Sequence, residues 1–110
     1  MAYQKIPVRS DLPSYIFSIT LEGTLYYLSF EWNDRGSFWT MDILDQDQNH
    51  LVAGIRMITN INLLGRFRNE LLPKGTFFIY DTSGKNQDPQ VDNFGSVVLL
   101  FYRESTTVDE

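Results

Sequence analysis

The first half of the chain alternates between hydrophobic and polar residues, which is the pattern of half-buried β-strands. Three such segments cover residues 15–21, 25–32 and 37–44, and a fourth hydrophobic segment follows residue 50. The first segment places one set of side chains on a single face: Tyr15, Phe17, Ile19 and Leu21. Short alternating segments separated by turn residues predict a four-stranded meander.

Turn residues separate these predicted strands. Glu22-Gly23 predicts a tight hairpin, because glycine adopts positive φ without steric cost. The sequence Asn33-Asp34-Arg35-Gly36 has asparagine first and glycine last, which is a type I turn signature. We expect Asn33 and Gly36 to be structural turn residues, with Gly36 in the left-handed conformation.

The third turn carries Asp45, Asp47 and Asn49 at alternate positions, as the start of a calcium-binding loop does. An EF-hand loop also needs glycine at its sixth position and glutamate at its twelfth. Counting from Asp45, these positions hold His50 and Arg56. A guanidinium cannot coordinate a cation, so we interpret this segment as a polar hairpin turn and expect no metal there.

The alternation ends after residue 58. In TNINLLGRFRNELL (59–72), apolar residues at helical spacing predict one short helix near residues 61–71: Ile61, Leu64, Phe67 and Leu71. Gly65 in its interior costs about 1 kcal/mol relative to alanine, so we expect this helix to be distorted. Pro73 and Gly75, in the turn that follows, hold the second and fourth turn positions.

The final segments are a strand at 76–81, a polar loop at 82–93 and a last strand at 94–103 that begins around Gly95. The last strand is apolar on both faces, which predicts a central strand or one covered by a partner. We therefore predict an apolar interaction surface beside this strand, formed by Val97, Leu99, Phe101 and Tyr102.

These segments predict an all-β, mainly antiparallel fold in a single domain. It would contain six to seven strands and one short helix, arranged as a small β-barrel or a sandwich, and the sequence leaves these two open. We expect an N-terminal extension at 1–13, the β domain at 14–103 and a mobile C-terminal tail at 104–110.

Composition excludes several classes of partner. The 110 residues carry 9 basic and 14 acidic side chains, for a net charge of −5. Nucleic-acid binding depends on basic side chains that neutralise phosphates, so we expect no nucleic-acid partner. The chain has no cysteine. Its N-terminal residues lack the apolar core of a signal peptide, and no apolar run approaches the length of a membrane span. We expect a soluble protein, made without an export signal, with no membrane partner.

Catalytic groups are sparse. His50 is the only histidine, and no GxSxG motif accompanies it. Asp42, Asp81 and Asp92 lie on or beside predicted strands, where a carboxylate pair could perform glycoside chemistry, but such pairs arise in any acidic β protein. We expect no catalytic residue, no cofactor and no enzymatic activity.

The order of several fragments resembles a known family. FEWNDRGSFWTMDILDQDQNHLVAGIRM, NLLGRF, LPKGTFFIYDTSG and DNFGSVVLLFY follow one another as in the small plug domain of contractile-tailed phage baseplates, a family named from a cyanophage baseplate plug. The resemblance covers residues 14–103. It implies a structural virion protein in the tail baseplate, present in several symmetric copies and found in the host cytoplasm during assembly.

The resemblance also implies partners among the other baseplate proteins, with the central hub first and the spike or tail tube as further candidates. A second interpretation is a small carbohydrate-binding β-module that uses Trp32 and Trp39 as stacking surfaces together with nearby acidic residues. The two interpretations differ in where these tryptophans lie, because a stacking platform must be exposed, whereas an assembly protein can keep both in its core.

Overall fold

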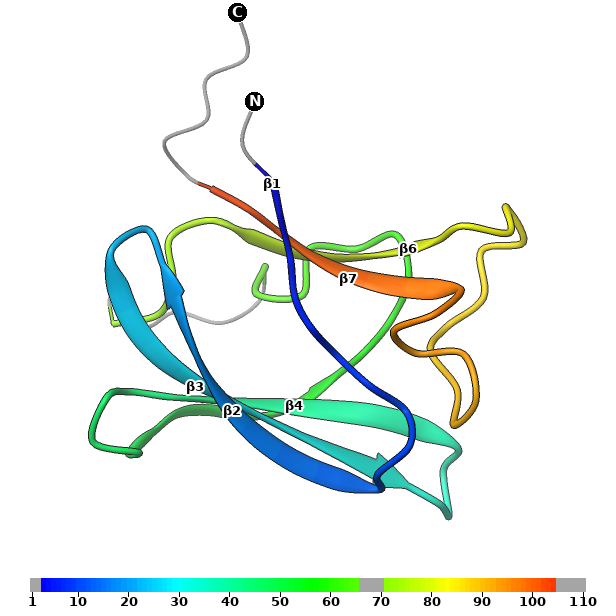
Figure 1. The fold of residues 1–110 in the computed structure, drawn as a ribbon, viewed down its shortest axis with the longest axis horizontal. Helices are drawn as coiled ribbons and strands as arrows, with labels where there is room; N and C mark the ends of the chain where they lie inside the picture. Colours follow the sequence, from blue (N-terminus) through cyan, green and yellow to red (C-terminus); the bar gives the residue numbers. More distant parts are fainter. Residues whose placement is uncertain (1–2, 66–70, 105–110) are drawn as a thin grey trace, which may run out of the picture.

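The described part of the chain folds into seven strands in two antiparallel sheets (Figure 1). The computed structural model describes residues 3–65 and 71–104. The strands are β1 (Tyr3–Lys5), β2 (Ser14–Leu21), β3 (Thr24–Asn33), β4 (Phe38–Leu44), β5 (His50–Arg56), β6 (Thr76–Asp81) and β7 (Val98–Arg103). The predicted all-β class is confirmed. The sheets remain separate rather than forming a closed barrel, which is consistent with a sandwich.

The predicted meander forms the larger sheet, in the order β2-β3-β4-β5. Its first hairpin has a two-residue turn in which Glu22 and Gly23 have φ of +52° and +84°. Two positive φ values define the type I′ turn, whose twist matches that of the flanking strands. Leu21 and Thr24 pair directly across the turn, so the hairpin predicted from Glu22-Gly23 is confirmed.

The second turn differs in one detail from the prediction. The left-handed residue is Ser37, with φ of +59°, and not Gly36. The Asn33 side chain accepts a hydrogen bond from the Gly36 N–H at 2.9 Å, and the Asn33 carbonyl accepts one from the Ser37 N–H at 2.8 Å. A side chain at Gly36 would lie against the Phe38 ring, 2.2 Å from Cε2. Gly36 therefore lies beside a side chain and does not have the left-handed conformation that was predicted.

The smaller sheet has the order β1-β7-β6, with β7 in the centre as its apolar sequence predicted. Its strand β1 belongs to the segment that we expected to be an N-terminal extension. Tyr3 pairs with Arg103, and the Ile6 N–H donates to the Leu100 carbonyl at 2.9 Å. Ile6 is fully buried. Residues 3–6 are therefore part of the packed fold.

The predicted short helix near residues 61–71 is wrong for the residues that can be assessed. Residues 61–65 form turns, in which the Asn62 carbonyl accepts from the Gly65 N–H at 3.0 Å and the Asn62 side chain accepts from the Leu64 N–H at 3.1 Å. Side-chain hydrogen bonding by asparagine favours turns over helix. Residues 66–70 lie outside the described part of the chain.

The core lies between the two sheets and is rich in large side chains. Trp39 and Phe30 of the meander face Phe94 of the other layer, with ring centroids 5.7 and 5.9 Å from that of Phe94. All three are almost completely buried. Over residues 3–65 and 71–104, no helix has the length and apolar character needed to cross a membrane.

Candidate docking surface

The outward face of the smaller sheet is aromatic and aliphatic. Along β7, side chains at alternate positions are buried in the core: Val98, Leu100 and Tyr102. Leu99 and Phe101 therefore point outward, and both are half-buried. Val97 directly precedes the strand and is 39% exposed. Three of the four residues predicted as an interaction strand thus lie outside the core.

Pairing brings further apolar side chains onto the same face. Phe78 pairs with Phe101, and Tyr80 pairs with Leu99, so these two residues of β6 also point outward. Tyr3 of β1 occupies the outward face on the other side of β7. We call this set the outer aromatic face: Tyr3, Phe78, Tyr80, Leu99 and Phe101. The sequence pattern missed three of its members, because only strand pairing reveals which residues flank β7.

Three rings on this face contact one another, and Phe78 is the ring that the other two share. Phe78 stacks on Phe101 with centroids 5.5 Å apart, and the edge of Tyr3 meets Phe78 at 5.8 Å. Tyr80 is 54% exposed and Tyr3 is 50% exposed. Offset and edge-to-face aromatic pairs are favourable arrangements, so these three rings stabilise one another on the surface.

The charges within the outward face of these three strands are basic. Lys5 pairs with Phe101, and Arg103 pairs with both Tyr3 and Thr76. The chain as a whole carries a net charge of −5. The face is therefore apolar in its centre and positive at its side, unlike the rest of this acidic protein.

Tyr102 was also predicted for the interaction surface, but it lies in the core and is fully buried. Its hydroxyl accepts a hydrogen bond from the Gly75 N–H at 2.8 Å and donates one to the Glu22 carboxylate at 2.5 Å. Burial, together with the hydrogen bond to Glu22, raises the pKa of Tyr102 well above its ordinary value. Tyr102 thus joins the two layers from within.

The remaining predicted turn residues surround this sheet. Pro73 is buried just before β6. A side chain on Gly75 would lie 2.1 Å from the Arg103 carbonyl oxygen. Gly95 has φ of +95°, and a side chain there would lie 2.4 Å from the Val8 carbonyl oxygen. Both glycines permit close backbone contact at the two ends of β7.

The tryptophans do not form a binding platform. Trp39 is fully buried, and its indole N–H donates to the Gln90 carbonyl at 2.9 Å. Trp32 is half-buried and meets Trp39 edge-on, with centroids 5.6 Å apart. The stacking surface that a carbohydrate-binding module requires is therefore reduced to part of one ring.

Two of the three candidate acids, Asp42 and Asp81, serve the local structure, and the third, Asp92, is exposed in a turn. Asp42 accepts a hydrogen bond from the Gly54 N–H at 2.8 Å, and its carboxylate lies 3.4 Å from the exposed His50 ring. Asp81 is buried and accepts hydrogen bonds from Gln87 and Ser83. These bonds lower the pKa of Asp81 from 3.8 to about 2. Both carboxylates therefore have assigned structural partners.

The polar turn after β4 is held by Asp45. Its carboxylate accepts backbone hydrogen bonds from Asp47 and Asn49, each at 2.9 Å, and these bonds lower its pKa. The Asp45 Oδ1 atom, which would be a ligand at the first position of a calcium-binding loop, thus caps the turn. In the described ranges no group of three or more histidine or acidic side chains is placed to hold a metal ion.

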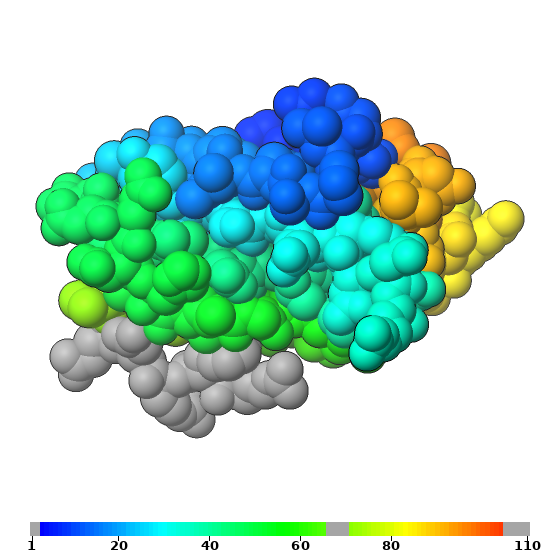
Figure 2. Space-filling model, turned by 90° about the horizontal axis from the view of Figure 1, so that it is seen from below, coloured from blue at the N-terminus to red at the C-terminus, as the bar shows by residue number. Residues whose placement is uncertain are grey.

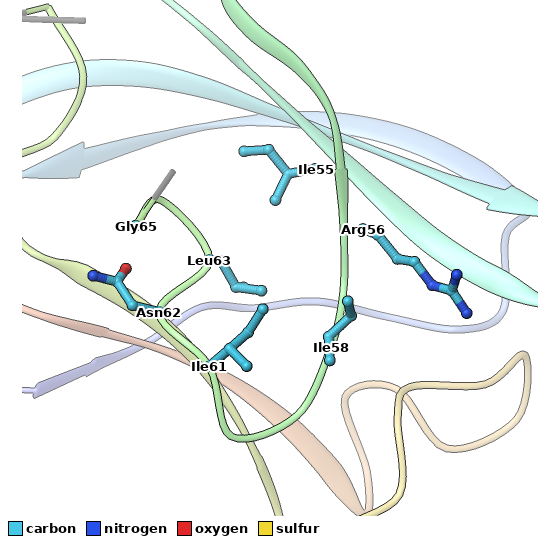
Figure 3. A pocket seen from close by; sticks show the side chains of 7 residues that line it. All are labelled: Ile55, Arg56, Ile58, Ile61, Asn62, Leu63 and Gly65. Carbon is cyan, nitrogen blue, oxygen red and sulfur yellow. The ribbon is translucent and has the colours of Figure 1, made fainter. Parts of the chain in front are cut away.

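A pocket of about 240 Å³ lies between the end of β5 and the turn that follows it (Figure 3). It is lined by Ile55, Arg56, Ile58, Ile61, Asn62, Leu63 and Gly65. The guanidinium carbon of Arg56 lies 4.3 Å from the centre of the Phe38 ring, and in Figure 3 this side chain extends away from the isoleucines. The pocket is mainly apolar.

Fold and surface together define a small β-sandwich that presents an apolar face. Comparison with known proteins identifies its family: the model described as "Cyanophage baseplate Pam3 plug gp18" matches residues 3–105, and the chain belongs to this family. The family supports a structural role in a phage tail baseplate, in association with other baseplate proteins. No curated protein matches the chain.

Proposed function

We propose that the protein is a non-enzymatic plug component of a contractile-tail baseplate that docks on the central hub through its outer aromatic face. The observation that carries this proposal is the apolar outward face of the β1-β7-β6 sheet, where Tyr80 and Tyr3 are about half exposed. Contiguous exposed apolar patches are uncommon on monomers and mark interaction sites. Membership of the plug family supplies the class of partner.

The charges on this face specify the partner surface further. Lys5 and Arg103 favour a hub surface with an apolar centre and acidic residues beside it, because complementary charge orients the encounter. Aromatic residues and arginine are the side chains that interface centres favour. Several copies would dock in this way around the symmetric hub, during assembly in the host cytoplasm.

The test is co-expression with the hub protein encoded by the same phage, followed by purification of the complex. Tyr80→Glu places a charge on the most exposed ring of the outer aromatic face and should abolish co-purification. Leu25→Glu is the matched control, because Leu25 is also exposed and apolar but lies on β3 of the other sheet. Wild-type protein that fails to bind the hub, or equal binding by both variants, would contradict the proposal.

A further inference from the structure

Strand β2 is a sheet edge whose residues 16–20 carry no feature that blocks pairing. It is the terminal strand of the β2-β3-β4-β5 sheet, and its eight residues, SYIFSITL, contain no charge and no proline. Natural proteins protect exposed edges with charges, proline, bulges or short strands, because an open edge pairs with other chains. In Figure 2, β2 (blue) runs along one border of the four-stranded sheet.

The other three sheet edges of the described chain are protected. In β5 the register shifts opposite Asp42, which holds the bulge through the Gly54 N–H, and the strand ends in Arg56. Strand β1 has three residues, one of them Lys5. On β6, the Phe77 carbonyl accepts a hydrogen bond from the Leu63 N–H at 3.1 Å. The contrast makes β2 the edge open to a partner.

The hairpin geometry shows which backbone groups are available on β2. Leu21 and Thr24 flank a two-residue turn. These two residues therefore exchange two backbone N–H···O=C hydrogen bonds, and every second pair along the strands does the same. Ile16, Ser18 and Thr20 are the intervening residues, and their N–H and C=O groups point away from β3. Their side chains are exposed on the outer face of the sheet.

The inner side chains of β2 are also incompletely covered. Tyr15, Phe17 and Ile19 face the core but are only half-buried, whereas Leu28 and Phe30 on the neighbouring strand are fully buried. An added strand with apolar side chains on this inner face and small uncharged ones outside would complete their burial. The sequence of β2 has this same pattern, so the strand is complementary to itself.

We infer that β2 pairs antiparallel with β2 of a second copy of this chain, about a two-fold axis at Ser18. This register pairs Ile16 with Thr20 through the backbone and Phe17 with Ile19 on the inner face, an aromatic and β-branched pair of the favourable kind. The preceding segment lies against the start of β2, where the Tyr15 hydroxyl accepts a hydrogen bond from the Arg9 N–H and donates one to the Arg9 carbonyl. Residues 16–20 therefore form the paired segment.

Charge limits where two copies can meet. Two copies that each carry −5 repel one another, and β2 is an edge at which they meet without bringing charged side chains together. Closed two-fold pairing is the commonest form of self-association. The pairing uses the layer opposite the outer aromatic face, so its success or failure is independent of docking on the hub.

A single cysteine tests the register, because the chain has no cysteine of its own. Residues directly paired through the backbone have Cα atoms about 5.5 Å apart, within the range of about 4.4–6.8 Å that a disulfide spans. Under mild oxidation, Ser18→Cys should form a covalent dimer much faster than Ser96→Cys, which places the thiol on an exposed turn. Equal rates would overturn the proposal.

Light scattering of the wild-type protein should give twice the chain mass of 12.8 kDa. Ser18→Lys places two ammonium groups at the axis and should yield a folded monomer, whereas Ser96→Lys should remain a dimer. A wild-type protein that is monomeric at every concentration, or a Ser18→Lys variant that remains dimeric, would overturn the proposal. If Ser18→Lys does not fold, the cross-linking rates of the two cysteine variants decide.

Discussion

The hydroxyl of Tyr102 donates a hydrogen bond to the carboxylate of Glu22, across 80 residues of sequence. Tyr102 lies on β7 of the smaller sheet, and Glu22 lies in the turn between β2 and β3 of the larger one. The same hydroxyl accepts a hydrogen bond from the Gly75 N–H. One buried side chain therefore ties both layers of the sandwich to the segment that precedes β6.

Removal of this hydroxyl should weaken the whole fold. Tyr102→Phe leaves the Gly75 N–H without its acceptor, and an unsatisfied buried group costs about 1–3 kcal/mol. Urea unfolding followed by tryptophan fluorescence should report a loss of this size. Tyr80→Phe is the control, since Tyr80 is exposed and surface changes stay within about 0.5 kcal/mol. Identical midpoints for the two variants would argue against the bridge.

Gly75 and Gly36 should respond differently to the same added methyl group. In Gly75→Ala the new carbon meets the Arg103 carbonyl and the Tyr102 ring, which are fixed in the sheet and core. Such overpacking costs about 1–3 kcal/mol, occasionally more. In Gly36→Ala it meets the Phe38 ring, a half-buried side chain that can rotate away. Thermal unfolding should rank Gly75→Ala as the less stable variant, and the reverse order would contradict this explanation.

Trp39 should contribute more stability than Trp32. Trp39 is fully buried between the layers, so Trp39→Ala should lower the free energy of unfolding by about 3–5 kcal/mol, the range for truncation of a large core aromatic. Trp32 is half-buried at the margin of the same cluster, and Trp32→Ala should cost less. Chemical denaturation of both variants measures the difference. A larger loss for Trp32→Ala would place the centre of the core elsewhere.

Asp81 should make stability depend on acid. Hydrogen bonds lower its pKa from 3.8 to about 2 in the folded protein, so folding favours the ionised carboxylate. Its contribution is complete above about pH 4 and is lost as the pH falls from 3.8 towards 2. Asp81→Asn should therefore be less stable than the wild type at neutral pH, and the difference should shrink across this interval. A difference that is constant from neutral pH to pH 2 would contradict the assignment.

The local sequence was sufficient to predict the meander. Side chains two residues apart share a face in any strand, so alternation alone predicts β2 and β3. The turn residues Glu22-Gly23 likewise predict the hairpin from two adjacent positions. The apolar character of β7 likewise predicted its central place in the sheet. One of its faces is buried in the core, and the side chains on its other face are half-buried between those of β1 and β6. Asp45 was interpreted correctly as part of a turn, because the sequence lacks the glycine and the glutamate that an EF-hand loop needs.

Tertiary structure decided what these local patterns could not. Tyr3 and Ile6 join the smaller sheet only because β7, about 100 residues later, offers a pairing edge, and no local periodicity indicates that partner. Of the described residues whose spacing predicted a helix at 61–71, only Leu64 is buried, whereas Ile61 and Leu71 are exposed, so the spacing does not mark one buried face. The alternation of β7 gives two faces, but only the position of the second sheet decides that Tyr102 is inside and Phe101 outside.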